Sequence, residues 1–86
     1  MRATGRIHHA ILSRSPRLQA LLALLIEVGS LGATTRQIID AIGICAVNSA
    51  VSELRRNGYA ITCVFEGRSP TGSSVFRYRL APMEQA

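Results

Sequence analysis

The chain has 86 residues, 48% of them hydrophobic and 17% charged, which predicts one small folded domain and excludes an intrinsically disordered or acidic chain. All ten basic residues are arginines against five acidic residues, so the formal net charge is +5 and the sequence pI is near 10.6. Arginine binds phosphates and guanine edges with a rigid fork of donors, so a nucleic-acid partner is compatible with this composition. Codon bias in a GC-rich genome would give the same arginine excess.

The first 14 residues form a basic lead segment, with Ile7, Ala10 and Ile11 at helical spacing. Three interpretations stay open: a basic arm for DNA phosphates or the minor groove, a dimerisation helix, and a disordered lead. His8 and His9 are adjacent, and neighbouring helix positions point about 100° apart, a poor geometry for one metal ion. We therefore expect no metal site and no cofactor.

An apolar helix is predicted between Ser15, which suits an N-cap, and Gly29, which suits a C-terminal stop. Pro16 is favoured in the first turn. The apolar positions at helical spacing are Leu18, Leu21, Leu22, Leu25 and Val28. Leu24 and Ile26 widen the apolar side, which predicts that neighbouring elements cover this helix on more than one side.

The same region, residues 14–33, also has the order of a signal peptide, with basic residues, an apolar run and small residues. Pro16 precedes the run and Glu27 interrupts its end, which favours a core helix. The run is much shorter than the roughly 20 residues that a membrane span requires. We expect a soluble, cytoplasmic protein.

A second helix is predicted to start with a capping box, in which Thr34 and Gln37 each satisfy a backbone donor of the other, and to end at Gly43. A short turn over residues 43–46 leads to a third helix at 46–57. Its inward stripe consists of Val47, Ala50, Val51 and Leu54. The opposite side carries short hydrogen-bonding side chains and guanidinium groups instead of the Glu and Lys pairs of an ordinary solvated helix face.

From Tyr59 the apolar period changes from 3.6 to 2, which predicts a two-stranded hairpin over residues 59–80 with a Gly, Ser and Pro-rich loop at 67–74. One predicted face carries Ile61, Cys63, Phe65, Phe76, Tyr78 and Leu80. Cys45 and Cys63 stand at positions that an apolar residue would suit, so we expect small, buried, reduced thiols and not a disulfide.

The segment TTRQIIDAIGICAVNSAVSELRRNGYAI, followed by a hairpin that ends in FRYRL, resembles small winged helix-turn-helix proteins of phages and prophages. The resemblance covers roughly residues 31–80 and implies an α+β fold, with a three-helix core, a two-stranded C-terminal wing and possibly an additional N-terminal helix. The implied domain is 15–81, between an arm or short helix at 1–14 and a tail at 82–86.

The resemblance implies sequence-specific binding of double-stranded DNA by a transcriptional regulator of a phage or mobile element. The helix at 46–57 would enter the major groove, and the hairpin at 59–80 would be the wing. The residues nearest base edges would be Asn48, Ser49 and Ser52. Those placed to bind phosphates would be Arg36, Arg55, Arg56, Arg68, Arg77 and Arg79, with Arg56 also able to bind guanine.

Each of these residues also has a purely structural interpretation. Arg55 and Arg56 would stabilise a helix C-terminus through its dipole. Asn48 or Ser49 would serve as a displaced N-cap. Arg77 and Arg79 would protect an edge strand from aggregation.

A lone winged domain contacts few base pairs, so we expect a homodimer that forms through the arm or the first helix. The alternative function is a protein-binding winged module, such as a phage adaptor or inhibitor of a host protein, that binds no DNA. Catalytic residue arrangements and phosphate-binding glycine loops are missing from the sequence, so we expect no enzymatic activity.

Overall fold

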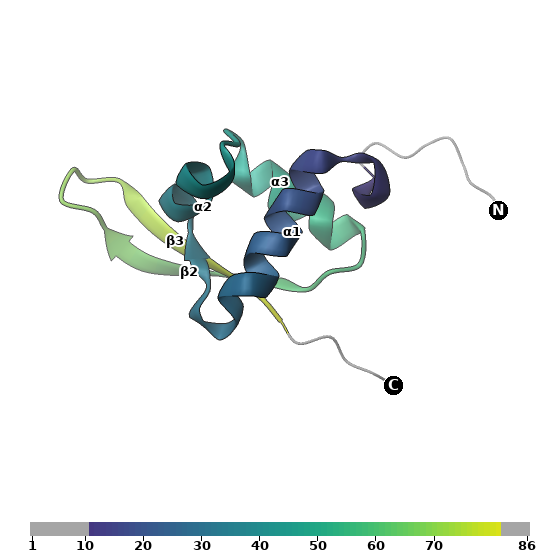
Figure 1. Ribbon diagram of the computed structural model, residues 1–86. Helices are drawn as coiled ribbons and strands as arrows, with labels where there is room; N and C mark the ends of the chain where they lie inside the picture. The colour runs from purple at the N-terminus through teal and green to yellow at the C-terminus, as the bar shows by residue number, and fades with distance from the viewer. Residues whose placement is uncertain (1–10, 82–86) are drawn as a thin grey trace.

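Three helices followed by a β-hairpin make up the fold of the computed structural model, which describes residues 11–81 (Figure 1). The helices are α1 (Pro16–Val28), α2 (Thr35–Ile42) and α3 (Val47–Arg56), and the strands are β1 (Ala33–Thr34), β2 (Ile61–Arg68) and β3 (Ser74–Leu80). Short 3-10 turns, η1 (Leu12–Arg14) and η2 (Gly29–Leu31), flank α1. The interpretations of His8, His9 and the N-terminal arm concern residues 1–10, outside the described residues.

The helix ends follow the local sequence signals. The Ser15 hydroxyl accepts a hydrogen bond from the Leu18 N–H, and α1 ends at Gly29. Both bonds of the capping box between Thr34 and Gln37 are present at the start of α2. The predicted boundaries of the three helices are therefore confirmed, since each depends on a few adjacent residues.

α3 begins after Ala46, and no side chain caps its first turn. Asn48 and Ser49 are exposed within that turn, so the prediction that one of them caps the helix is wrong. Their side chains form no hydrogen bond with any other residue between 11 and 81.

The core lies between the three helices and the inner face of the sheet. Its eleven buried residues are Leu18, Leu21, Leu25, Ala33, Ile38, Val47, Ala50, Val51, Leu54, Ile61 and Tyr78. All four predicted inward residues of α3 belong to it. Ile26 is 62% exposed, so the predicted cover on more than one side of α1 does not extend to this residue.

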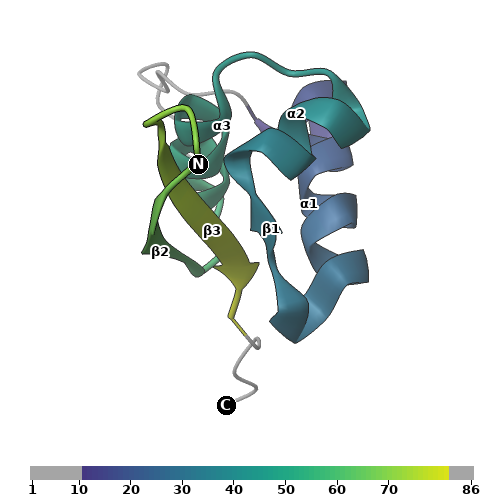
Figure 2. The same cartoon turned by 90° about the vertical axis from the view of Figure 1, so that its left-hand side faces the viewer.

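The sheet has three antiparallel strands in the order β1-β3-β2, whereas the sequence predicted only the hairpin strands (Figure 2). In β1, Ala33 pairs with Tyr78 and Thr34 with Arg77. Since β3 is the central strand, the interpretation of Arg77 and Arg79 as protection of an edge strand is also wrong. A two-residue strand is too short to show a period of 2, which explains why the sequence did not reveal it.

The loop end of the hairpin projects beyond the helices, as Figure 1 shows. The inner face of the sheet is consequently covered where it meets the helices, fully at Ile61 and Tyr78 and partly at Leu80, while Phe65 and Phe76 stay exposed. Cys63 is exposed on this face, and Cys45 is exposed in the turn before α3. Both cysteines are free as predicted, but the prediction that they are buried is wrong.

The segment before α2 approaches β3 so closely that only glycine fits at one position. Gly32 has φ +72°, and a Cβ atom there would lie 2.7 Å from Cγ of Arg79 and 2.8 Å from the carbonyl oxygen of Tyr78. The carbonyl belongs to the backbone of the central strand, so it has little room to move. Gly29 has φ +55° but has no atom within 4 Å of such a Cβ.

These two glycines allow the close approach to be tested by substitution. We expect Gly32→Ala to lower the free energy of unfolding by about 3 kcal/mol, because it adds a clash to the cost of a positive φ. Gly29→Ala should lower it by only about 1–2 kcal/mol, because it adds the backbone cost alone. Urea unfolding of both variants measures the difference, and equal losses would show that the segment can move away from β3.

Candidate nucleic-acid interface

The side of α3 that faces away from the core presents Asn48, Ser49, Ser52 and Arg56. All four side chains are exposed. None forms a hydrogen bond or ion pair within the described part of the chain. The helix itself is held in place by the buried stripe beneath and by an ion pair from Arg17 of α1 to Glu53. Short donors and acceptors on a well-packed helix can therefore meet a partner without breaking internal bonds.

Arg55, one residue before Arg56, has an internal role instead. Its Nε and Nη2 atoms donate to the carbonyl oxygen of Ile61 at 3.1 and 2.7 Å. These bonds connect the last turn of α3 to the first residue of β2. The two adjacent arginines thus differ in role. Arg55 connects α3 to β2, whereas the Arg56 guanidinium has no partner among residues 11–81 and can bind another molecule.

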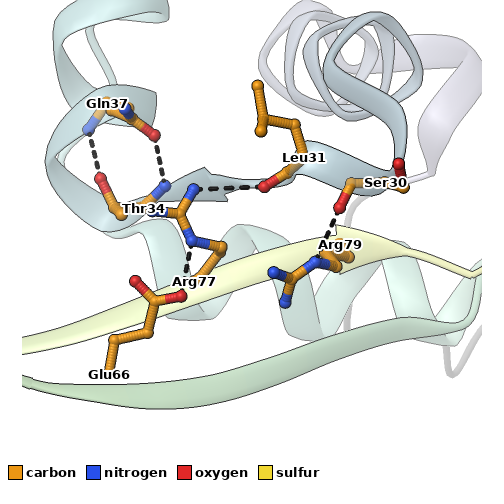
Figure 3. A network of polar contacts seen from close by, with 7 residues as sticks. All are labelled: Ser30, Leu31, Thr34, Gln37, Glu66, Arg77 and Arg79. Atoms are coloured by element: carbon orange, nitrogen blue, oxygen red, sulfur yellow. Dashed lines mark hydrogen bonds and ion pairs between the residues drawn. The ribbon is translucent and has the colours of Figure 1, made fainter.

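Arg77 and Arg79 of the central strand also bind internal partners (Figure 3). Arg77 donates from Nε to Glu66 at 2.7 Å and from Nη1 to the carbonyl of Leu31 at 3.2 Å. Arg79 donates from Nε to the carbonyl of Ser30 at 2.9 Å. Both residues therefore secure η2 and the strand β1 that follows it against the sheet.

Arg36 and Arg68 are the more accessible cations beside the hairpin. The Arg36 side chain is 78% exposed and lies 4.0 Å from Asp40, a separation typical of a weak surface pair. Arg68 donates from Nη1 to the carbonyl of Gly72 at 3.1 Å across the hairpin loop. Each guanidinium retains donors for a further acceptor, because arginine has five N–H groups.

Two ionisable groups have displaced pKa values. The hydrogen bond from Arg77 lowers the pKa of Glu66 below its ordinary value of 4.5, with the charges of Arg77 and Arg79 acting in the same direction. Burial raises the pKa of Tyr78 above its ordinary value of 10, and neighbouring Cys63 adds to the increase. Thr35 and the charge of Arg55 act in the opposite direction and lower this pKa.

Two adjacent cavities separate β3 from the first turns of α2 and α3. The larger, of about 480 Å³, is lined by six Ser or Thr residues together with Arg36, Ile39, Val75 and Phe76. The smaller, of about 300 Å³, is lined by Thr35, Cys45, Val47, Asn48, Ser74, Phe76 and Tyr78. No acidic residue is among the described residues that line either cavity. Sequence reasoning missed this feature, because its walls come from segments about 40 residues apart.

Other kinds of site have little support among residues 11–81. They contain no group of three or more His, Cys, Asp or Glu side chains that could hold a metal ion. No single helix in this range is long and apolar enough to cross a membrane; α2 and α3 pass that test only as a pair, and they are bent by 90° at the turn between them.

Comparison with protein-family models, curated proteins and solved structures gives no match for the chain. The structure therefore establishes the architecture, which is an α+β fold of three helices and a C-terminal hairpin in a three-stranded antiparallel sheet.

The adjacent arginines at the end of α3 give a matched pair of variants. Arg55→Ala should lower the free energy of unfolding by about 1–2 kcal/mol, because the Ile61 carbonyl loses both donors. Arg56→Ala should change it by less than about 0.5 kcal/mol, because the Arg56 side chain forms no bond with the described residues 11–81. Urea unfolding checks both values, and a large loss in Arg56→Ala would assign that residue an internal role.

Tyr78 should make the protein sensitive to alkali. Since the folded state holds the Tyr78 proton more tightly than the unfolded state, this contribution to stability is complete below about pH 10 and decreases as the pH rises through the raised pKa. We expect urea unfolding to show this decrease in the wild type and in Cys63→Ser, which lacks the neighbouring thiol. Tyr78→Phe should show a smaller decrease, and an unchanged decrease would assign the effect to other groups.

Proposed function

We propose that the protein is a winged helix-turn-helix protein that binds double-stranded DNA, with α3 in the major groove and the β2–β3 hairpin as the wing. The order of three helices and a hairpin, with β1 completing the sheet, supports this fold assignment. The observation that carries the proposal is the outward side of α3, where an amide, two hydroxyls and a guanidinium have no partner among residues 11–81. The proposed role is transcriptional regulation in a phage or mobile element.

Groups of this kind match the chemistry of DNA. An asparagine amide can donate to and accept from adenine, and serine hydroxyls can bond to several bases. Asn48, Ser49 and Ser52 would contact base edges, while Arg56, further along the helix, would bind a phosphate or a guanine. α3 is too short to contact many base pairs, so two copies of the chain would bind adjacent half-sites.

The internal bonds of the arginines limit the electrostatic part of this binding. Arg55, Arg77 and Arg79 bind carbonyl oxygens of other elements, and Arg17 is paired with Glu53, whereas Arg68 bonds only within its own hairpin loop. The exposed cations of the described residues that remain are Arg14, Arg36, Arg56 and Arg68. Each protomer would therefore neutralise about three to four phosphates through these residues.

A second candidate function has one observation in its favour. Val64 and Phe65 are 46% and 54% exposed on the hairpin, and exposed apolar side chains are common in protein-binding surfaces. Under this alternative, the chain would bind a host protein through the hairpin, and substitutions of Asn48, Ser52 and Arg56 would have no effect.

Fluorescence anisotropy of a labelled random-sequence duplex, titrated with protein across a salt series, tests the proposal. We expect the logarithm of the affinity to fall linearly with the logarithm of the salt concentration, with a slope of about −2.7 to −3.6 per protomer from the described residues. Arg56→Ala should reduce the magnitude of the slope by about 0.9, since one phosphate contact is lost. Asn48→Ala should alter the preference among sequences in a site-selection experiment more than it alters affinity for random DNA.

Arg56→Lys is the matched control, because it keeps the charge and should keep the slope. Absence of binding even at low salt would contradict the proposal and direct the search to a protein partner. Binding whose salt slope is the same in the wild type and Arg56→Ala would show that α3 is not the DNA-contacting element.

A further inference from the structure

The two cavities beside β3 form one continuous cleft, because Thr35, Ser74 and Phe76 line both of them. We propose that this cleft binds one sugar-phosphate strand of the DNA duplex, with Phe76 packed against a deoxyribose. This inference rests on the proposed function. It identifies the surface between α3 and the wing that would hold the DNA backbone.

The lining of the cleft suits an anionic sugar chain. Arg36 supplies a guanidinium at the outer end, and Ser73 and Ser74 supply hydroxyls without side-chain partners among the described residues. Among residues 11–81, no carboxylate lines the cleft to repel a phosphate. The start of α2 is not itself the anion site, because its capping box already satisfies the backbone N–H groups of Thr34 and Gln37.

An aromatic ring stands among these polar groups. Phe76 is 37% exposed and packs against Phe65, with 5.5 Å between ring centroids and an interplanar angle of 56°. The contact holds the ring in place on the inner face of the hairpin. A DNA strand alternates apolar sugar edges with charged phosphates, and a fixed ring beside hydroxyls and a guanidinium matches that alternation.

The inner end of the cleft leads directly to the first turn of α3. Asn48 and Cys45 line this end together with Phe76. A strand in the cleft would therefore pass beside the residue that we assign to base recognition. With α3 on one side of this strand and the hairpin on the other, the strand would separate the groove that holds α3 from the groove next to the wing.

The native cysteines provide a direct test. Cys45 lines the cleft, whereas Cys63 is also exposed but lines neither cavity. We would alkylate the full-length protein with iodoacetamide, with and without a saturating random-sequence duplex, and follow both thiols by mass spectrometry. The duplex should slow alkylation of Cys45 about tenfold, and Cys63 should change less than about twofold, since only the first thiol is covered.

Variants of the hairpin separate the cleft from the rest of the interface. Phe76→Ala should weaken binding of the random duplex about tenfold while the salt slope stays constant, because apolar contact is lost and no charge is removed. Phe76→Tyr keeps the ring and should bind like the wild type. Val64→Ala is the matched control, because Val64 is similarly exposed but faces the other side of the hairpin, and its affinity should not change. Thermal unfolding shows whether each variant is folded.

The outcomes distinguish this inference from the proposed function. One outcome would overturn the cleft assignment alone: Phe76→Ala binds the duplex normally and Cys45 stays reactive. If Arg56→Ala still reduces the salt slope in that case, the assignment of α3 as the DNA-contacting helix stands. If Phe76→Ala and Phe76→Tyr are both folded and equally weakened, the ring is not the contact. If free nucleoside monophosphates protect Cys45 and the duplex does not, the cleft holds a small molecule and the strand assignment is wrong. If no duplex binds, both proposals fail.

Discussion

The close packing of residues 29–34 against β3 is the constraint on which the rest of the structure depends. Gly32 allows the two backbones to approach, and the bonds from Arg77 and Arg79 to the carbonyls of η2 hold them together. Thr34 then serves twice, as the last residue of β1 and as the N-cap of α2. The register of a two-residue strand thus determines where α2 begins, and through Thr35 it sets one wall of the cleft. The local capping box and the long-range pairing of β1 with β3 both involve Thr34. Such agreement between local and long-range interactions helps to specify a single fold.

Because of this packing, the net charge of the chain overstates how many guanidinium groups are available to a partner. A formal charge of +5 predicts a basic surface, but among residues 11–81 four arginines, Arg55, Arg68, Arg77 and Arg79, donate to backbone carbonyls and another pairs with Glu53. These guanidiniums satisfy acceptors that regular secondary structure leaves open, in η2, in the hairpin loop and at the start of β2. The hairpin is therefore less cationic toward a partner than its sequence indicates, and hydroxyl and aromatic groups make up most of its remaining contact chemistry. An electrostatic footprint read from composition alone overestimates the number of phosphates that such a domain can bind.

The parts of the fold that depend on adjacent residues were predictable from sequence. Caps and a 3.6-residue period determine the helices, and the same period identifies the outward side of α3, including Asn48, Ser52 and Arg56. The contacts that sequence reasoning could not find are nonlocal: β1 has no period of its own, and the partners of Arg77 and Arg79 lie 46 and 49 residues away. Alternation along the hairpin correctly assigned side chains to faces. It could not show that the helices cover Ile61, Tyr78 and part of Leu80 but leave Cys63 exposed, so the prediction that Cys63 is buried was wrong.

The exposed apolar side chains of the hairpin bear on both candidate functions. Phe65 and Phe76 lie on the inner face with the cleft, and Val64 lies on the outer face. The sheet has two edge strands, β1 and β2, and β1 pairs with β3 only at Tyr78 and Arg77. At the β2 edge, a protein partner that extended the sheet would meet an irregular register between Phe65 and Arg68. Such irregularities disrupt the ladder of an edge strand and hinder the addition of another strand. Strand addition to β2 is thus disfavoured at the loop end of the hairpin, beside the exposed aromatic pair. A ligand that enters from the inner face meets no such obstacle, and this asymmetry favours the cleft over the edge as the place where the aromatic pair is covered.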